Sequence, residues 1–256
     1  MNRLLRYLFI HYGLFKWVRR NLPHRVNFGD LRRLTPISPN FGYERGLPGR
    51  RYYIESYLSQ HAQDIHGHVL EIGDDTYTRK YGGSRVTRSD VLHVTTGNPK
   101  ATIVADLCSA DCIASNTYDC VIFTQTLQCI YNVRAAIRTL HRILKPGGVV
   151  LASFSGIAQL SSYDMARWGE YWRFTSLSAR RLFEEIFPRE NIEVKSYGNV
   201  LTAIAFLHGL AAEELSREEL DYHDPNYEVV ITLRAVKEEP SQTFVHSHGS
   251  SGDMWV

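Results

Sequence analysis

Residues 119–124 of the sequence are apolar at almost every position and read Asp-Cys-Val-Ile-Phe-Thr. A run with no polar face is typical of a central strand in a parallel sheet that is covered on both faces. Similar short apolar segments alternate with segments of helical spacing, and this alternation predicts an α/β fold with a doubly wound, mostly parallel sheet. The expected strands are residues 68–72, 84–88, 101–105, 119–124, 149–154, 192–196 and 227–235.

Start and stop signals place the helices between these strands. Asn132 is a candidate N-cap, and Val133 and Ala136 begin an apolar helical spacing, so we expect a helix over residues 132–144. The Pro-Gly-Gly sequence at residues 146–148 ends it. The other expected helices are a segment entering the first strand from residues 50–53, about one turn ending at residues 82–83, residues 176–187 and about residues 200–215.

We place the α/β domain at residues 51–237, between an N-terminal extension and a polar tail at 238–256 that we expect to be disordered. Residues 1–20 combine an apolar face with several Arg and Lys residues, which predicts a basic amphipathic helix followed by an irregular connector up to residue 50. The helix is too short and interrupted to span a bilayer, and no small-residue cleavage site indicates secretion. It could rest on the anionic inner membrane face, or pack on its own domain or on a partner subunit.

The composition limits the partners and the metal chemistry. A formal net charge of +2 over 256 residues predicts no nucleic-acid partner, and we expect a cytoplasmic location. The four cysteines, at positions 108, 112, 120 and 129, form no CxxC pair, so free thiols are favoured over a zinc site. Gly-x-Ser-x-Gly, His-Glu-x-x-His and Walker patterns do not occur, which argues against the hydrolases that use them.

Polar side chains follow four successive predicted strands. Asp74 and Asp75 come after the first strand, Asp90 after the second, Asp106 after the third and Gln125 after the fourth. Each acidic residue alone could simply cap a helix or end a strand. Because ligands of a doubly wound sheet bind beyond the carboxyl ends of its strands, the joint placement predicts a ligand site at this edge.

The turn at residues 71–75, Glu-Ile-Gly-Asp-Asp, disfavours a dinucleotide. A dinucleotide site needs G-x-G-x-x-G, so that backbone amides can approach the pyrophosphate. Here Asp74 and Asp75 stand where that anion would lie, and like charges at roughly 4 Å repel by about 4 kcal/mol per pair. NAD and FAD are therefore poor candidates, whereas a ligand with a cationic end and ribose hydroxyls would suit this turn.

Five motifs occur in order: Val69-Leu70-Glu71-Ile72-Gly73, Asp90, Asp106-Leu107, Tyr118-Asp119-Cys120-Val121-Ile122 and Leu144-Lys145-Pro146-Gly147-Gly148. Over about residues 51–237, this ordered set resembles the class I S-adenosylmethionine-dependent methyltransferases, in particular the small methyltransferase-domain type. The resemblance implies a Rossmann-like sheet of seven strands, S-adenosylmethionine as the cofactor, and transfer of its methyl group.

The resemblance also implies roles for the residues of the first turn. Glu71 would act on the methionine portion of the cofactor by its charge, and Gly73 by allowing close backbone approach; Asp74 belongs to the same cofactor-binding turn. The family usually has further glycines here, where this chain has Asp75 and Tyr77.

The remaining cofactor roles fall on the ends of the next three strands. Asp90 would accept hydrogen bonds from the ribose hydroxyls. Asp106 would contact the amino group of adenine, with Leu107 packing on the ring, and Gln125 would line the methyl-donor pocket.

The acceptor side is expected after the fifth strand, in residues 162–175, where aromatic and charged side chains alternate. Asp164 is the first candidate for a catalytic base and His93 the second. Alternatively, the aromatic groups only cap the edge of the sheet. The substrate-side candidates are Tyr53, Arg167, Trp168, Tyr171, Trp172 and Arg173.

We therefore expect an enzyme that transfers a methyl group from S-adenosylmethionine to a small-molecule or glycan acceptor. Two alternatives remain open: a non-catalytic domain of the same fold that binds the cofactor or has lost it, and a nucleotide-sugar or NAD-dependent enzyme on a similar sheet.

Overall fold

The computed structural model describes residues 27–240 of the chain, so the predictions for residues 1–20 and for the tail beyond residue 240 lie outside the described residues. The chain divides into two units, Met1–Pro36 and Ile37–Val256. Within the first unit, the described residues contain a short 3-10 helix, η1 (Gly29–Leu31). Between residues 27 and 240, no helix is long and apolar enough to cross a membrane.

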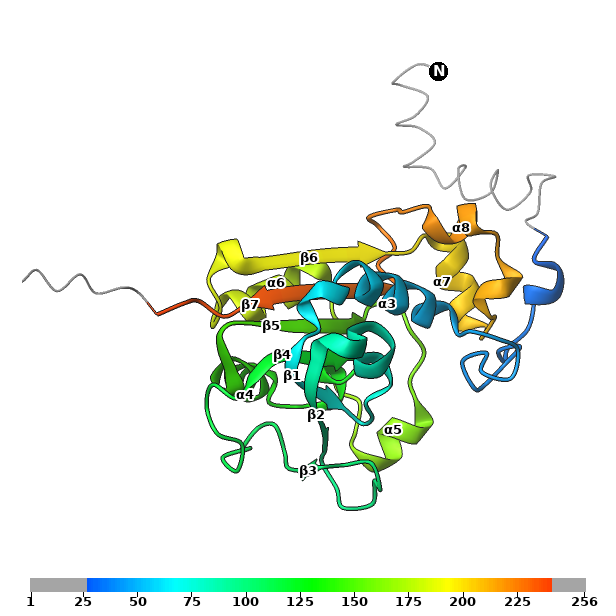
Figure 1. The fold of residues 1–256 in the computed structure, drawn as a ribbon. Coiled ribbons are helices and arrows are strands. Elements are labelled where there is room, and N and C mark those ends of the chain that lie inside the picture. The colour runs from blue at the N-terminus through cyan, green and yellow to red at the C-terminus, as the bar shows by residue number, and fades with distance from the viewer. Residues whose placement is uncertain (1–26, 241–256) are drawn as a thin grey trace, which may run out of the picture. The chain divides into compact units, whose positions relative to one another are not determined.

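The second unit contains a seven-stranded sheet in the order β3-β2-β1-β4-β5-β7-β6 (Figure 1). Neighbouring strands from β3 to β5 pair in parallel, and β7 pairs antiparallel with both β5 and β6. The order reverses between β1 and β4, which makes their carboxyl ends the expected ligand position. The strands are β1 (Gly67–Ile72), β2 (Val86–His93), β3 (Ile103–Val104), β4 (Tyr118–Thr124), β5 (Leu144–Ser155), β6 (Ile192–Tyr197) and β7 (Val230–Val236).

Helices cover both faces of this sheet. Side chains of α3 and α7 pack with Val69, Cys120 and Leu151 on one face, and those of α4 and α6 pack with Leu70 and Val121 on the other. Adjacent strand residues point to opposite faces, so a strand buried on both sides must be apolar throughout. The α-helices are α3 (Gly49–Gln60), α4 (Val133–Ile143), α5 (Ser162–Arg167), α6 (Ser176–Glu184), α7 (Val200–Leu207) and α8 (Arg217–Asp221). The short helical turns are η2 (Ala62–Asp64), η3 (Thr78–Gly82), η4 (Gly83–Arg85), η5 (Leu127–Cys129), η6 (Arg189–Asn191) and η7 (Ala212–Glu214).

The predicted α/β fold with its seven strands is confirmed, whereas several boundaries differ from the predicted ones, and the following three differences have a clear physical reason or affect the domain limits. β2 ends at His93 instead of residue 88, because Asp90 is buried inside the strand instead of ending it. The predicted helix over residues 200–215 stops at Leu207, just before Gly209 takes a left-handed φ of 68°. The second unit begins at Ile37, so part of the predicted extension belongs to the compact unit.

Candidate functional site

A cavity of about 670 Å³ opens at the carboxyl ends of β1 to β4, where the strand order reverses. Its wall includes Gly73 after β1, His93 at the end of β2, Asp106 after β3 and Gln125 after β4. The segment from α5 onward closes it from above with four more side chains: Asp164, Arg167, Trp168 and Tyr171. A volume of this size and a mixed polar and apolar lining are typical of small-molecule sites.

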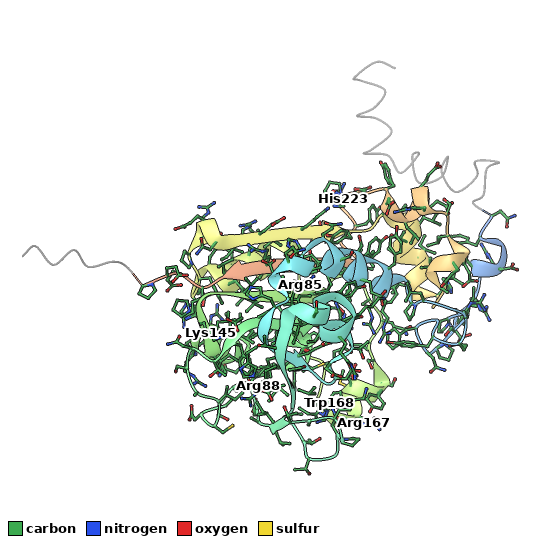
Figure 2. All side chains as sticks on the ribbon, viewed as in Figure 1. Arg85, Arg88, Lys145, Arg167, Trp168 and His223 are labelled. Atoms are coloured by element: carbon green, nitrogen blue, oxygen red, sulfur yellow. The ribbon has the colours of Figure 1, made fainter. Side chains whose placement is uncertain are left out.

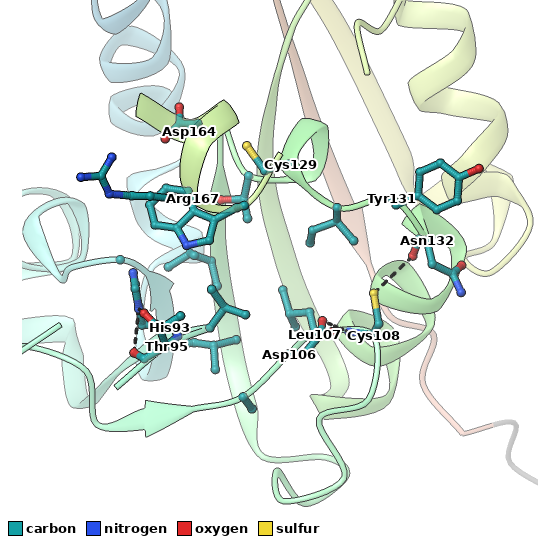
Figure 3. A pocket seen from close by; sticks show the side chains of 18 of the residues that line it. His93, Thr95, Asp106, Leu107, Cys108, Cys129, Tyr131, Asn132, Asp164 and Arg167 are labelled. Carbon is teal, nitrogen blue, oxygen red and sulfur yellow. Dashed lines mark hydrogen bonds between the residues drawn. The ribbon is translucent and has the colours of Figure 1, made fainter. Parts of the chain in front are cut away.

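The side chains at the end of α5 and just after it lie at one end of the strands. Arg167 and Trp168 lie beside the carboxyl ends of the parallel strands, whereas Lys145, at the start of β5, lies toward the opposite edge (Figure 2). Figure 3 shows Asp164 and Arg167 on one side of the cavity, with Asp106 and Leu107 on the other. The β3 end and α5 therefore form different sides of the cavity.

Glu71 does not line this cavity. Its carboxylate is 3% exposed and accepts hydrogen bonds from the Thr78 backbone at 2.7 Å, the Thr78 hydroxyl at 2.7 Å and the Tyr77 backbone at 3.2 Å. Burial raises the pKa of Glu71 to about 7 in spite of these hydrogen bonds. The Glu71 carboxylate, which the sequence predicts to act on the methionine portion of the cofactor, thus anchors the helical turn after β1 in the structure.

This arrangement also bears on the NAD alternative. In a dinucleotide fold, the first amides of the helix after β1 bind the pyrophosphate. Here the Tyr77 and Thr78 amides donate to Glu71, so they are occupied by a carboxylate of the chain itself. The argument against a pyrophosphate therefore becomes stronger, although it rests on Glu71 more than on Asp74 and Asp75.

The carboxylates of Asp74 and Asp75 both have partners within the chain. Asp74 accepts from the Thr76 backbone at 3.0 Å and lies 3.7 Å from the Lys100 ammonium. Asp75 pairs with Arg79 at 2.6 Å. Neither carboxylate lines the cavity, and the contact of Asp74 with a cofactor stays a prediction.

Gly73 does reach the cavity, as predicted. It has a left-handed φ of 86°, and its carbonyl accepts a hydrogen bond from the Asn98 side-chain amide at 2.5 Å. Asn98 belongs to the segment after β2, in which the structure has no helix, as expected from the sequence. The Asn98 contact ties this segment to the turn after β1.

The prediction that Asp90 ends β2 is wrong, because the strand continues to His93; the contact of Asp90 with a ribose stays a prediction. Its carboxylate is 6% exposed and lies 2.7 Å from His68 Nε2, while accepting hydrogen bonds from Thr102 at 2.9 Å and Tyr118 at 3.3 Å. Burial alone would raise the pKa of Asp90, but the hydrogen bonds from His68 and Thr102 hold it below the ordinary value. These bonds hold β1, β2 and β4 together, and Asp90 does not line the cavity.

His93 takes the place at the end of β2. Its Nδ1 lies 2.9 Å from the Thr95 carbonyl, and its ring meets Trp168 edge to face at 5.8 Å. Within residues 27–240, its Nε2 has no hydrogen-bond partner. The imidazole therefore belongs to the cavity wall and keeps one ring nitrogen unbonded by described residues.

The β3 end matches the predicted placement. Asp106 and Leu107 both line the cavity, Asp106 exposed and Leu107 buried. Asp106 accepts the Cys108 backbone N–H at 2.8 Å through Oδ1. Its second oxygen remains available for a ligand.

Gln125 lines the cavity from an unusual backbone position. It has a φ of 50°, a left-handed value that a side chain other than glycine adopts only at a cost of order 1 kcal/mol. Its amide nitrogen donates to Ser153 at 3.2 Å, and its amide oxygen accepts from Ser155 at 2.6 Å and from Gln128 at 3.2 Å. Such a held, strained residue is typical of functional sites. No pattern in the sequence indicates its serine partners.

The segment after β5 divides the substrate-side candidates. Arg167, Trp168 and Tyr171 line the cavity, but Trp172 does not; it donates to the Ile130 carbonyl and stacks on Tyr131, both of which are residues of the cavity wall. Arg173 also lies outside the cavity wall: it donates to the Ala158 and Gln159 carbonyls and pairs with Glu170 at 2.8 Å. Tyr53 is 3% exposed in the core, where it donates to the Leu220 carbonyl and stacks on Tyr197. The structure does not bring Trp172, Arg173 and Tyr53 into the cavity wall, because packing and loop support use these side chains; their contacts with a substrate stay predictions.

A second cavity, of about 520 Å³, adjoins the first. The two share His93, Thr95, Arg167 and Trp168, and the second is completed by Tyr163 and residues 97–99. The importance of Thr95 and Asn98 was missed from the sequence, and only their position just after a strand could have indicated it. In the part of the chain that the structure describes, no three His, Cys, Asp or Glu side chains are grouped to hold a metal ion.

A family model described as a methyltransferase domain matches residues 47–194. The chain belongs to this methyltransferase family. The predicted methyltransferase family, the enzyme class and the Rossmann-like fold are confirmed, and S-adenosylmethionine as the cofactor stays a prediction.

Solved structures similar to this methyltransferase share its fold at low identity. One is a SAM-dependent methyltransferase from Archaeoglobus fulgidus, with 10% identity, a TM-score of 0.50, and coverage of 73% of this chain and 94% of the other. Another is phosphoethanolamine N-methyltransferase 2 from Haemonchus contortus, solved with phosphomonomethylethanolamine and S-adenosylhomocysteine, with 17% identity and a TM-score of 0.50. That match covers 84% of this chain and 61% of the other, so this chain spans less than two thirds of that enzyme.

The same fold also occurs in an enzyme with another reaction. The [4+2]-cyclase SpnF matches with 15% identity, a TM-score of 0.50, and coverage of 79% of this methyltransferase and 89% of the cyclase. A search of curated protein sequences returned no match. The acceptor of this methyltransferase must therefore be inferred from its own side chains.

Proposed function

We propose that this protein transfers the methyl group of S-adenosylmethionine to a polar small-molecule or glycan acceptor. The observation that carries the proposal is the 670 Å³ cavity at the strand-order reversal, with Asp106 and Leu107 at one side and α5 at the other. When bound, the cofactor supplies a methyl group that is already activated by its sulfonium. The protein then has mainly to hold the reactants and exclude water.

The residues at the cavity fit such a cofactor. The free oxygen of Asp106 can accept from the amino group of adenine, and Leu92 and Leu107 offer apolar contacts to the ring. A phosphate-bearing cofactor fits less well, because the amides after β1 are occupied and Arg167 is the only Lys or Arg among the described residues of the wall. These groups of the cavity wall suit a nucleoside with a charged amino-acid end.

The second cavity is the proposed acceptor site. Its wall combines the aromatic rings of Tyr163 and Trp168 with the polar side chains of Thr95 and Asn98. Aromatic faces beside hydrogen-bonding groups suit a polar ring compound, such as a sugar. His93 lines both cavities, so it lies between the proposed donor and acceptor.

His93 is the proposed proton acceptor for the acceptor's nucleophile. His93 lines both cavities and its Nε2 has no hydrogen-bond partner among the described residues, whereas Asp164, the first candidate from the sequence, lines the cofactor cavity alone. A base at this position contributes on the order of a hundredfold or more to rate. The geometry thus favours the second of the two sequence candidates.

Calorimetry with the full chain tests the cofactor site directly. We expect stoichiometric binding of S-adenosylhomocysteine and none of NAD. The Asp106→Asn variant should bind S-adenosylhomocysteine about ten- to a hundredfold more weakly, because a hydrogen bond to a charged group is lost. Asp111→Asn is the matched control, since Asp111 is exposed and lies outside the cavity wall.

Transfer of labelled methyl groups to a panel of sugars and small polar alcohols and amines then tests the reaction. Labelled product supports the proposal and identifies the acceptor atom. Failure of the wild-type chain to bind S-adenosylhomocysteine would refute it. Tight binding without transfer to any acceptor would instead favour the non-catalytic scaffold.

A further inference from the structure

Helix α5 contributes two oppositely charged residues to the wall of the cofactor cavity. Asp164 and Arg167 are three residues apart, so they share one face of the helix, and both line the cavity. Ser161 caps the helix by accepting the Asp164 backbone N–H at 3.1 Å, which fixes the start of this short segment. The two charges are therefore held on the same wall.

Neither charge has an ion pair within 4.0 Å among the described residues, although the Arg50 guanidinium is near enough to interact with the charge of Asp164. Among residues 27–240, the Asp164 carboxylate has neither an ion pair within 4.0 Å nor a hydrogen-bond donor. The Arg167 guanidinium donates once, to the Tyr163 carbonyl at 3.1 Å, and lies 3.4 Å above the Tyr163 ring. Stacking and one hydrogen bond orient the guanidinium but leave most of its donors unused.

The other charged groups near the first turn are already paired. Glu71 is bound by the Tyr77 and Thr78 amides, Asp74 is near Lys100 and Asp75 is paired with Arg79. The turn after β1 therefore has no free carboxylate at the cavity wall. A ligand's charged end has to find its partners elsewhere.

Arg167 nevertheless lies near that turn. It lines the second cavity together with Asn98, and the Asn98 amide is bonded to the Gly73 carbonyl. The neighbouring Trp168 meets His93 at the end of β2. The helix thus stands over the β1 and β2 ends, opposite the side where Asp106 lies (Figure 3).

We propose that Asp164 and Arg167 together recognise the amino-acid end of the cofactor, Asp164 its ammonium and Arg167 its carboxylate. The inference rests on the proposed cofactor site. A guanidinium can bind a carboxylate through two parallel hydrogen bonds, and a carboxylate on the same helical face suits the ammonium attached to the same carbon. The resemblance implies that the turn after β1 contacts the methionine portion of the cofactor, whereas this proposal assigns its amino-acid end to α5, the helix after β5.

Two ligands separate this role from a general effect on the cavity. S-Adenosylhomocysteine carries the amino-acid end, whereas 5′-methylthioadenosine has the same adenine, ribose and thioether without it. By calorimetry, Arg167→Gln and Asp164→Asn should each weaken S-adenosylhomocysteine about ten- to a hundredfold and leave 5′-methylthioadenosine unchanged within about twofold. Arg181→Gln, an exposed arginine on α6, is the matched control and should change neither.

Decarboxylated S-adenosylhomocysteine, which keeps only the ammonium, separates the two residues from each other. Arg167→Gln should not affect its binding, and Asp164→Asn should weaken it. A thermal melt without ligand checks that both variants remain folded, which the exposure of Arg167 favours.

Three results would overturn the inference. Equal loss of S-adenosylhomocysteine and 5′-methylthioadenosine would mean that the substitution disturbs the whole cavity. Unchanged S-adenosylhomocysteine binding with a raised KM for the acceptor would assign Arg167 to the acceptor. If the wild-type chain bound neither nucleoside, the proposed function itself would be refuted, and this result is distinguishable from the first two, in which the wild type binds.

Discussion

The ionisation of Glu71 should make the stability of this protein fall with pH. The carboxyl is buried, and its folded-state pKa is about 7, compared with 4.5 for the unperturbed group. A raised pKa in the folded state means that the folded chain holds a proton that the unfolded chain releases. Its contribution to stability is therefore fully present below pH 4.5 and is lost as pH rises to about 7.

The two pKa values set the size of the effect. Their difference corresponds to about 3 kcal/mol in the free energy of unfolding, most of it lost between pH 5 and pH 8. For a chain of this length, this amounts to roughly 6–12 °C in Tm. Glu71→Gln cannot ionise, so its stability should lack this decline.

Urea unfolding of the wild type and Glu71→Gln, at pH values from 5 to 8, measures the difference. The wild type should lose about 2–3 kcal/mol relative to the variant over this range. Asp75→Asn removes a carboxylate from the same turn without touching the Thr78 anchor, and serves as the control. Parallel pH profiles for the wild type and Glu71→Gln would contradict the buried-charge argument.

Three further predictions separate catalysis, stability and location. His93→Gln should lower kcat about a hundredfold while the Kd of S-adenosylhomocysteine changes little, as single-turnover kinetics and calorimetry would show. Asp90→Asn should destabilise the fold by about 1–3 kcal/mol in urea unfolding without altering cofactor affinity, because its partners His68 and Thr102 lie away from the cavity wall. The amphipathic pattern of residues 1–20 predicts that the full chain floats with anionic liposomes and a chain starting at residue 21 does not; equal flotation would refute a membrane contact.

Apolar patterning sufficed to predict the fold, because burial on both faces leaves a direct trace in the sequence. Residues 119–124 were recognised as a central strand for this reason, and β4 is found at Tyr118–Thr124. The end of β2 was missed, since polar Ser89 and Asp90 look like a strand end unless the tertiary partner His68 is known. Strand existence is a local property, but the burial of one carboxylate depends on a residue 22 positions away.

The sequence also does not show which of the predicted site carboxylates are already hydrogen-bonded by other parts of the chain. Glu71 and Asp90 occupy the motif positions, yet donors from the chain already use their oxygens: Thr78 and Tyr77 for Glu71, His68 and Thr102 for Asp90.

Asp106 and Asp164 remain, because each lines the cavity with at least one oxygen that no described residue binds. A buried carboxylate that is fully bonded has little to gain from a ligand, whereas one with an unused acceptor at a cavity wall has. On this ground the two ends of the cofactor cavity are assigned to Asp106 and to α5, and the acidic motif residues between them support the sheet and its first helical turn.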